Sequence, residues 1–436
     1  MRLPGIRLRD EYLEPSFVEQ EVRRRKEWML ANGQLFYLRA KAEESSIFWI
    51  LAALSARLTI VPIHPASTAE EIRRFRDVLG DAIELSDEKL AAITPMPFTR
   101  KDMQGVSAIL FSSGSTGVPK AIAITERNLL ASARAHEIQH GLTPSDRWLL
   151  SLPLFHIGGF SIISRAYFLG QDIAFSAQLN VEEAVFWMGS GLVTGLSMVP
   201  TLLWRVLEKN PNPACKAKLL LLGGAALPNA TRERALRARL PIKVSYGLTE
   251  SCSQVFSDWV SSDSSPQYAG RAHAGVEYRV LESGELCLRG EMISPGNWHN
   301  GEIINDRDEE SFLHTGDLVE LDREMRLSVQ GREGDLIISG GENIFPVEVE
   351  DAILSIEWIV DVAVVGIPSE EWGKQIGALV VLRETHPADP EQELRKLLRD
   401  KINPWKQPKR YLFGKNVPRN AMKKIIRQEV LQLFLP

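Results

Sequence analysis

A loop of hydroxyl and glycine residues follows an apolar run and ends in a lysine. After Ile109–Phe111 the chain reads Ser112, Ser113, Gly114, Ser115, Thr116, Gly117, Val118, Pro119 and Lys120. Glycines let backbone N–H groups approach an anion closely, and the hydroxyls add further donors. The lysine adds a positive charge. This combination of residues is suited to holding the phosphates of a nucleotide.

Two other interpretations of this loop are weighed against phosphate binding. It is not a Walker A loop, because Pro119 precedes Lys120 and Ala121 follows it, where that pattern needs glycine before and serine or threonine after. It can also be an ordinary flexible surface loop, as runs of serine and glycine often are. The apolar run ahead of the loop and the lysine at its end favour the phosphate site.

Further segments carry small, aromatic and acidic residues in a fixed order along the chain. They are Gly223-Gly224-Ala225-Ala226-Leu227-Pro228, Tyr246-Gly247-Leu248-Thr249-Glu250-Ser251, His314-Thr315-Gly316-Asp317, Gly331-Arg332, Gly340-Gly341-Glu342-Asn343-Ile344 and Pro418–Arg427. Together with the loop they resemble the motifs of the adenylate-forming superfamily, which comprises acyl-CoA synthetases, luciferases and peptide-synthetase adenylation domains. The resemblance extends from about residue 45 to the C-terminus.

This resemblance implies a nucleotide site with particular roles for the residues. Gly224, Ala225 and Ala226 form a small-residue turn against adenine, although such a turn also begins many helices. Tyr246, followed by Gly247, stacks on adenine, and Thr249 meets the α-phosphate. Glu250 binds Mg²⁺, which prefers oxygen ligands and bridges a carboxylate to phosphate, and Thr116 is the second predicted metal residue. A glutamate in a loop is otherwise usually just solvated.

The remaining motifs imply a ribose site and a mobile C-terminal part. Asp317 accepts hydrogen bonds from both ribose hydroxyls, as two carboxylate oxygens can, and Arg332 lies nearby. Gly334 is the hinge, where relatives often carry Asp or Lys. The loop of the thioester-forming step has Gly340, Gly341 and Glu342. The catalytic lysine is Lys424, or Lys423 in its place, because Lys423 replaces the usual glycine before it.

Within the superfamily, three segments resemble the 2-succinylbenzoate–CoA ligases of menaquinone biosynthesis. They are Ser151–Gly159, Ser197–Arg205 and Leu221–Pro228. The resemblance makes His156 a catalytic residue that gates or lines the acyl pocket, although a lone histidine here can also be a satisfied core residue. Ser197 and Thr201 can reach the second carboxylate or the ketone of a keto-diacid, or they can be helix caps.

The predicted function is ATP- and Mg²⁺-dependent activation of a carboxylic acid to an acyl-adenylate, with transfer to coenzyme A. The expected acid is 2-succinylbenzoate. The alternatives are a CoA ligase for another aromatic or short-chain acid, or an enzyme that loads a carrier protein. A nucleotide-binding relative without catalysis is a further alternative, against which the presence of Glu250, Asp317, Arg332 and a C-terminal lysine argues.

The elements that position these residues follow from hydrophobic periodicity. Short apolar runs such as Leu219–Leu222 alternate with helical patterns such as Pro200–Lys209, which is typical of a wound α/β sheet. From about Gly270 short strands and turns predominate. After Gly331 the pattern is α+β, with helices near Val347–Ile356 and Glu391–Asn403. We expect a large N-terminal adenylation domain, residues 1–331, and a small mobile C-terminal domain, residues 332–436.

Composition excludes several classes of function. The chain of 436 residues has a net charge of −5, so nucleic acid is not an expected partner. The three cysteines stand far from any histidine in the sequence, which suggests neither disulfides nor a zinc site. The N-terminal segment lacks the apolar core of a secretory signal, and Ile47–Leu54 is too short to span a bilayer. We expect a cytoplasmic protein, and a homo-oligomer is left open.

Overall fold

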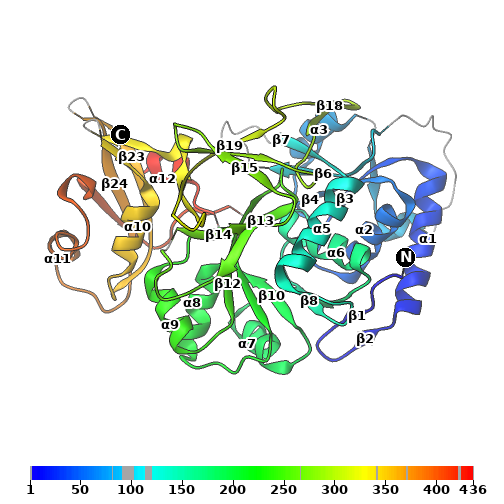
Figure 1. The fold of residues 1–436 in the computed structure, drawn as a ribbon, viewed down its shortest axis with the longest axis horizontal. Coiled ribbons are helices and arrows are strands. Elements are labelled where there is room, and N and C mark those ends of the chain that lie inside the picture. Colours follow the sequence, from blue (N-terminus) through cyan, green and yellow to red (C-terminus); the bar gives the residue numbers. More distant parts are fainter. Residues whose placement is uncertain are drawn as a thin grey trace.

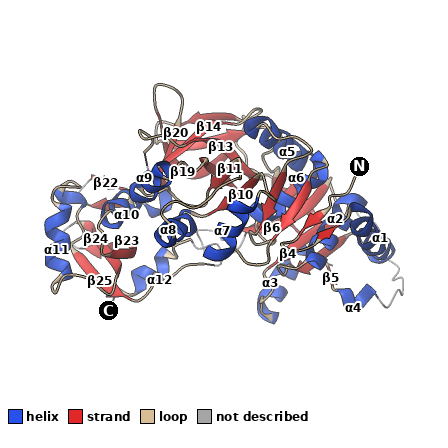
Figure 2. Cartoon of the chain, turned by 90° about the horizontal axis from the view of Figure 1, so that it is seen from below, coloured by secondary structure: helices blue, strands red, loops and turns tan. Residues whose placement is uncertain are grey.

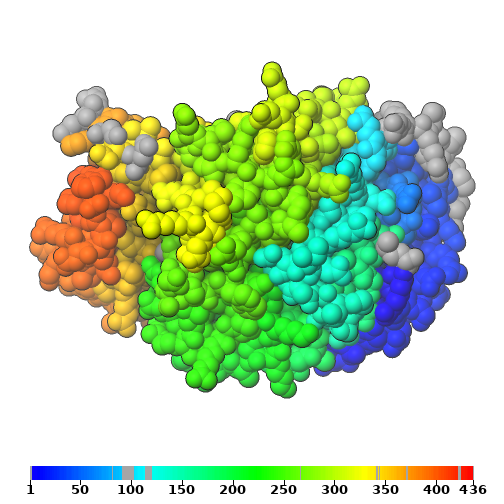
Figure 3. Space-filling model, in the orientation of Figure 1, coloured from blue at the N-terminus to red at the C-terminus, as the bar shows by residue number. Residues whose placement is uncertain are grey.

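The computed structural model describes residues 2–80, 82–90, 103–112, 120–265, 267–339, 342–369, 372–420 and 424–435. Within these ranges the strands form three sheets, arranged along the longest axis of the molecule (Figure 1). The N-terminal part lies at one end, the C-terminal part at the other, and the middle of the chain between them (Figures 1 and 3).

The first sheet is built mainly from the N-terminal part of the chain. Its strands, in spatial order, are β18 (Glu302–Ile304), β17 (Gly296–His299), β7 (Lys120–Thr125), β6 (Val106–Ser112), β4 (Thr59–Ile63), β3 (Leu35–Arg39) and β5 (Ile83–Leu85). Strands β6 and β7 form an antiparallel pair in which Ser112 lies opposite Lys120. The two ends of the predicted phosphate loop are therefore neighbours, whereas Ser113, Gly114, Ser115, Thr116 and Gly117 lie outside the described residues.

Helices cover both faces of this first sheet. They are α1 (Pro15–Asn32), α2 (Glu44–Ala56), α3 (Ala69–Leu79), α4 (Asp87–Leu90) and α5 (Glu126–His140). The apolar segment Ile47–Leu54 is entirely buried in α2, and β4 follows it. The sequence-based prediction of a buried helix that leads into a strand is confirmed.

The second sheet runs through the middle of the molecule. In spatial order its strands are β15 (Glu277–Val280), β16 (Glu285–Arg289), β19 (Leu313–Leu321), β20 (Leu327–Arg332), β14 (Tyr268–Ala272), β13 (Ser253–Trp259), β12 (Ile242–Leu248), β11 (Leu219–Leu222), β10 (Gly195–Met198), β8 (Arg147–Leu150), β9 (Asp172–Phe175), β1 (Ile6–Arg7) and β2 (Tyr12–Leu13). Neighbouring strands from β12 to β1 are parallel, and β13 turns antiparallel to β12. This mixture agrees with the predicted change from a wound sheet to short strands near Gly270.

Helices alternate with the parallel strands of the second sheet. They are α6 (Ile157–Leu169), α7 (Val181–Ser190), α8 (Pro200–Lys209) and α9 (Asn229–Arg237). Helix α8 begins with Pro200 in its first turn, where the missing N–H costs no hydrogen bond. Its bounds are those that the sequence predicts. Because the strands are parallel, the loops that precede these helices all leave the same edge of the sheet.

The N-terminal segment, for which the sequence made no prediction, completes the far edge of this sheet. Strand β1 pairs in parallel with β9, and β2 folds back on β1. The hydroxyl of Tyr12 donates a hydrogen bond of 2.6 Å to Asp172 at the start of β9. Two-residue strands carry little periodicity, so the sequence could not reveal them.

The third sheet forms the C-terminal domain. It contains β22 (Glu342–Ile344), β21 (Ile337–Ser339), β24 (Gly373–Leu382), β23 (Ile359–Ser369) and β25 (Arg410–Gly414), with helices α10 (Pro346–Leu354), α11 (Pro390–Leu398) and α12 (Arg427–Gln432) around it (Figure 2). Helix α11 ends at Leu398, so the prediction of a helix to Asn403 was too long. Asn403 precedes Pro404, which disfavours helical backbone at that residue.

The connection to the C-terminal domain follows β20. A short 3-10 turn, η1 (Glu333–Asp335), contains Gly334, which is exposed and has no atom within 4 Å of where a Cβ would lie. The predicted boundary at residues 331 and 332 falls at the end of β20 and stays a prediction. Among the helices that the structure describes, none has the length and apolar character needed to cross a membrane.

We predict that Ile50→Ala, in the centre of α2, lowers the free energy of unfolding by about 2–5 kcal/mol, because Ile50 is 0% exposed and a cavity would remain. Urea unfolding monitored by circular dichroism measures the change. The matched control is Ile138→Ala in α5, whose side chain is 67% exposed and which should change stability by less than about 0.5 kcal/mol. Equal effects of the two substitutions would contradict the placement of α2 in the core.

Candidate active site

The predicted site residues gather at the edge of the second sheet where its parallel strands end. His156 follows β8, the turn Gly223–Ala226 follows β11, and Tyr246 lies near the end of β12, with Thr249 and Glu250 immediately beyond that strand. Asp317 and Arg332 come from the paired strands β19 and β20, in which they lie opposite each other. Segments distant in the sequence are thus brought together by topology at the edge where open α/β sheets bind ligands.

Asp317 is the centre of a hydrogen-bonded cluster. The hydroxyl of Tyr246 donates to Asp317 Oδ2 at 2.6 Å, and Arg332 Nε donates to Oδ1 at 2.9 Å. Burial, together with the Asp317 charge, raises the pKa of Tyr246 well above its usual value. Asp317 itself is buried, so this pairing keeps a charged carboxylate in place below the surface. The role of the Tyr246 ring against adenine stays a prediction.

Glu250 is the described carboxylate suited to a magnesium ion. Burial raises its pKa, while the charges of Arg332 and Lys120 oppose that rise. Its backbone carbonyl accepts a hydrogen bond of 2.7 Å from Ser294 N, which fixes the main chain. No ion pair within the described part of the chain engages its side chain, so its oxygens are available to a hard cation. Thr116, the other predicted metal residue, lies outside the described residues.

The small residues of the site are required by close packing. Gly247 forms part of a bulged pairing with β13, and a Cβ there would lie 1.5 Å from the carbonyl oxygen of Ser253. In the turn after β11, Gly224 has a φ of 82°, and Gly224 and Ala225 are exposed. A flat ring can therefore approach this turn without meeting side chains. Ala226 lies beside them and is half-buried.

Lys424 reaches this site from the C-terminal domain. Its backbone N–H donates to Asn420 Oδ1 at 3.0 Å, and its carbonyl accepts from Asn420 N at 2.9 Å, which closes a tight turn. The surrounding protein and the Arg332 charge lower the pKa of Lys424, while Asp317 and Glu250 oppose this. Asp317 and Glu250 are the predicted ribose and magnesium residues, and the role of Lys424 toward the nucleotide stays a prediction. Lys423 lies outside the described residues.

His156, the predicted acyl-pocket residue, is affected by the charge of the same lysine. It is the residue before α6, and burial, aided by the positive charge of Lys424, lowers its pKa to about 4. The imidazole is therefore neutral near pH 7. Its Nε2 is buried and has no hydrogen-bond partner within the described residues. This argues against the alternative of a satisfied core histidine, because buried polar atoms are usually paired.

The other predicted acyl-pocket residues are placed less favourably for that role. Ser197 is buried in β10, and its Oγ accepts a hydrogen bond of 3.1 Å from the indole N–H of Trp148. Thr201 is exposed in the first turn of α8. Ser197 thus already has one partner inside the sheet. The contribution of both residues to the acyl pocket stays a prediction.

Arg165 is a candidate residue that the sequence analysis missed. It lies in α6, nine residues after His156, is 4% exposed, and makes no hydrogen bond or ion pair with the described residues. Its guanidinium lies 5.9 Å from the ring of Trp148, the residue that holds Ser197. Burial lowers its pKa to about 9, which leaves it charged near pH 7. The available signal was a single arginine within the otherwise apolar run of this helix.

The predicted residues of the thioester step are placed only in part. Glu342 begins β22 and is exposed, and Gly334 lies in the turn η1. Gly340 and Gly341 lie outside the described residues. The C-terminal domain is held against the N-terminal domain by Asp351, which accepts from Asn229 Nδ2 at 3.0 Å, and by the Arg383–Glu208 ion pair at 2.7 Å. Helix α10 accordingly lies beside α9 (Figure 1).

Two family models match the chain. The AMP-binding enzyme model matches residues 75–298, and the model of the AMP-binding enzyme C-terminal domain matches residues 348–424. The chain belongs to the AMP-binding enzyme family. The prediction of an adenylate-forming family, made from the motifs, is therefore confirmed.

Named relatives agree with this assignment. The chain is 32% identical to the 2-succinylbenzoate–CoA ligase of Bacillus licheniformis over 360 residues, which is 80% of this chain and 75% of the relative. It is 31% identical to the ligase of the same name from Geobacillus kaustophilus over 407 residues, 88% of this chain and 80% of that one.

Solved structures show the same fold. The o-succinylbenzoate CoA synthetase from Bacillus subtilis, in complex with its acyl-adenylate intermediate, superposes with a TM-score of 0.86 at 25% identity, covering 98% of this chain and 95% of that one. ATP-bound MatB from Rhodopseudomonas palustris, at 22% identity, also gives 0.86, covering 99% and 96%. The predicted fold class, with a large N-terminal and a small C-terminal domain, is confirmed.

Three further histidines lie together, of which His136 and His273 are buried and His140 is half-buried. The rings of His136 and His140 lie 4.4 Å apart, and those of His140 and His273 lie 5.9 Å apart. Burial lowers the pKa of His136 well below its usual value, that of His140 to about 3 and that of His273 to about 4. With His156, these groups bind fewer protons in the folded than in the unfolded chain below about pH 6.5.

We predict that the free energy of unfolding falls as pH decreases from about 6.5 toward 5. The reason is that these histidines become protonated in the unfolded chain but stay neutral in the folded chain. Each one contributes up to about 1.4 kcal/mol per pH unit. Urea unfolding at a series of pH values measures this slope. His273→Gln should reduce the slope by about one proton, whereas the exposed His386→Gln serves as control. A flat profile would contradict the neutral cluster.

Proposed function

We propose that this chain uses ATP to convert a carboxylic acid to an acyl-adenylate and then to a coenzyme A thioester. The observation that carries the proposal is the position of Lys424. Its charge acts on His156, at the predicted acyl side, and it responds to Asp317 and Glu250, at the predicted nucleotide side. Both substrates are anions, so a cation placed between them reduces the repulsion that opposes their reaction.

The first step joins two groups that repel each other. A carboxylate oxygen attacks the α-phosphorus of ATP, the bond to the β-phosphate oxygen breaks, and pyrophosphate leaves. Lys424 neutralises the charge that develops on the α-phosphate, an effect that a fixed cation supplies without reorganisation. In the second step the thiolate of coenzyme A attacks the acyl carbon, and AMP leaves. The products are a thioester, AMP and pyrophosphate.

Each part of the nucleotide has its own predicted residues. Asp317, held by Tyr246 and Arg332, accepts hydrogen bonds from the ribose hydroxyls, and the exposed turn at Gly224 and Ala225 faces adenine. Glu250 holds Mg²⁺, which supplies charge neutralisation at the phosphates. The B. subtilis synthetase has been solved with ATP and magnesium ion, which supports this part of the proposal. Ser112 and Lys120 flank the phosphate loop at the ends of β6 and β7.

The two half-reactions use different faces of the C-terminal domain. We assign Lys424 to the adenylation step. Residues 332–436 then rotate at Gly334, whose open surroundings allow backbone rotation. The rotation exchanges Lys424 for the loop of Gly340, Gly341 and Glu342, which serves the thioester step. The coenzyme A step and this exchange are proposals by family likeness.

We infer that the acid is 2-succinylbenzoate. The relatives that carry this name support it, and Arg165 supplies a chemical reason. An unpaired buried guanidinium is costly unless a ligand brings a negative charge. Because 2-succinylbenzoate has two carboxylates, one can react while the other pairs with Arg165. A ligase for another acid, or for a carrier protein, would have the same nucleotide site and differ in this pocket. The cytoplasm stays the predicted compartment, consistent with three free cysteines.

We predict that pyrophosphate release from Mg-ATP is fastest with 2-succinylbenzoate, compared with benzoate, cinnamate, short fatty acids and benzoylpropionate, the same keto acid without the ring carboxylate. Coupled detection of pyrophosphate and of the thioester measures kcat/KM for each. Another acid preferred tenfold or more would keep adenylation and reject the assigned substrate. If none of these acids caused pyrophosphate release, the proposed function would be contradicted.

The same assay tests Arg165 separately. Arg165→Met should lower kcat/KM for 2-succinylbenzoate by about 10²- to 10³-fold, because a buried charge pair is lost. The value for benzoylpropionate should change by less than about tenfold. Arg205→Met, at an exposed position of α8, is the matched control and should leave both unchanged. Equal losses for the two acids would exclude Arg165 from carboxylate recognition.

We predict that Lys424→Ala slows formation of the acyl-adenylate by about 10²- to 10³-fold, the scale of one lost charge-stabilising group. Thioester formation from added acyl-adenylate should slow much less. Separate single-turnover assays of the two half-reactions measure this. Lys423→Ala decides between the two neighbouring lysines, and the exposed Lys415→Ala is a control. If Lys423→Ala alone abolishes adenylation, the roles of Lys423 and Lys424 are exchanged.

A further inference from the structure

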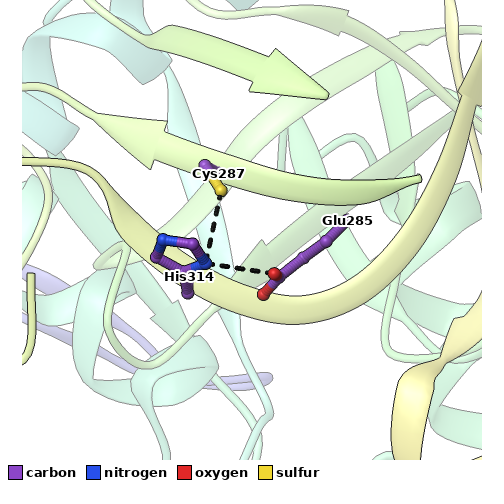
Figure 4. Close-up of side chains that lie close together, drawn as sticks. All are labelled: Glu285, Cys287 and His314. Atoms are coloured by element: carbon purple, nitrogen blue, oxygen red, sulfur yellow. Dashed lines mark hydrogen bonds and ion pairs between the residues drawn. The ribbon is translucent and has the colours of Figure 1, made fainter. Parts of the chain in front are cut away.

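A cysteine, a histidine and a glutamate meet on one face of the second sheet, apart from Glu250. Glu285 and Cys287 are two residues apart in β16 and therefore point to the same face. His314 lies directly opposite Cys287 in the neighbouring strand β19. The three side chains point toward one another (Figure 4). Among the described residues, this is a group whose ligand atoms all lie within 4.8 Å of one another.

This contact changes the interpretation of the cysteines. No cysteine stands beside a histidine in the sequence, and Cys287 and His314 are 27 positions apart along the chain. In the fold, Cys287 Sγ lies 3.7 Å from His314 Nδ1, and Glu285 Oε2 lies 3.0 Å from the same nitrogen. Proximity along the chain could not reveal this contact, because the antiparallel pairing of β16 and β19 produces it.

We propose that Glu285, Cys287 and His314 bind a thiophilic divalent cation of the Zn²⁺ type. In a tetrahedral zinc site, with metal–ligand distances of about 2.0–2.3 Å, neighbouring ligand atoms are roughly 3.3–3.8 Å apart. The separations of 3.0 and 3.7 Å are within a few tenths of an ångström of this range. One nitrogen, one sulfur and one oxygen ligand leave the fourth position to water, which can enter because His314 is 43% exposed in its side chain.

The residues around the group support this assignment. His314 Nε2 lies 3.4 Å from Asp308 Oδ2, so a carboxylate is placed to fix the ring with Nδ1 toward the cation, as is usual for histidine ligands of zinc. Arg279 lies opposite Cys287 and against its thiol, but its guanidinium is paired with both Asp308 and Glu310. Arg289, which donates to Glu310 O, is paired with Glu277. Glu285, Asp308 and Glu310 therefore carry more negative charge than Arg279 balances, which favours a cation.

The site adjoins the segment that carries Asp317. While Glu285 Oε2 faces His314, its Oε1 accepts a hydrogen bond of 2.9 Å from Gly316 N. Thr315 Oγ1 in turn donates to Leu286 O at 2.7 Å and accepts from Asp317 N at 3.1 Å. A bound cation would therefore fix the backbone that precedes the predicted ribose carboxylate. Cation binding itself does not depend on the acid-activation proposal.

Cobalt titration of the full chain, reduced and freed of metal with a chelator, tests the site. Co²⁺ bound by a thiolate gives a charge-transfer band in the near ultraviolet, which a magnesium-type site of oxygen ligands does not give. We expect this band to saturate at one Co²⁺ per chain and to disappear when Zn²⁺ is added. Excess Mg²⁺ should leave it unchanged.

Three variants complete the experiment. Cys287→Ser should abolish the band, and His314→Asn, at an exposed position, should weaken Co²⁺ binding at least about tenfold. Cys215→Ser, which changes another cysteine that is not fully buried, should keep the wild-type titration. Circular dichroism verifies that each variant is folded. Absence of the band in the wild type, or its persistence in Cys287→Ser, would overturn the proposal, whatever the outcome of the pyrophosphate assays.

Discussion

The repulsion between a carboxylate and a triphosphate is the constraint on which the site depends. Both proposed substrates are anions, and the reaction requires an oxygen of one to approach the phosphorus of the other. The chain meets this requirement with cations of different kinds. Arg332 is paired with Asp317, Arg165 in α6 makes no ion pair with the described residues, and Lys424 belongs to the C-terminal domain. In the proposed mechanism, Lys424 has to leave the site before the thiol can enter.

The architecture provides these positions through two simple features. The parallel strands from β8 to β12 end at one edge of the sheet. This edge therefore gathers His156, the turn after β11 and Tyr246, which are distant from one another in the sequence. The C-terminal domain then docks over that edge through a few polar contacts, Asp351 with Asn229 and Arg383 with Glu208. Such a small polar contact can be broken and remade, whereas the buried core of α2 and β4 cannot.

Much of this arrangement can be predicted from the sequence because its signals are local. Four leucines in β11 and the proline at the start of α8 define their elements without help from the rest of the chain. The motif residues Asp317 and Arg332 lie in contact, while the catalytic role of Lys424 stays a prediction. The exact end of α11, at Leu398, escaped prediction because residues 399–403 contain no glycine or proline that would signal the end of a helix.

What could not be predicted depends on partners distant in the sequence. The pairing of Cys287 with His314 follows from the register of β16 against β19, which no periodicity reveals. Arg165 looks like any arginine in a helix until the fold shows that no acidic side chain among the described residues reaches it. Ser197 resembles a substrate contact until Trp148 is seen to donate to it. Long-range neighbours decide the role of a polar residue in each case.

The most direct test of the account follows the oxygen atoms of the acid. The enzyme is supplied with ATP, coenzyme A and 2-succinylbenzoate whose carboxylates carry ¹⁸O, and the nucleotide product is analysed by mass spectrometry. If a carboxylate oxygen attacks the α-phosphorus, the product is AMP with one ¹⁸O in its phosphate. Unlabelled AMP, or ADP with the label in inorganic phosphate, would contradict an acyl-adenylate and with it the role assigned to Lys424.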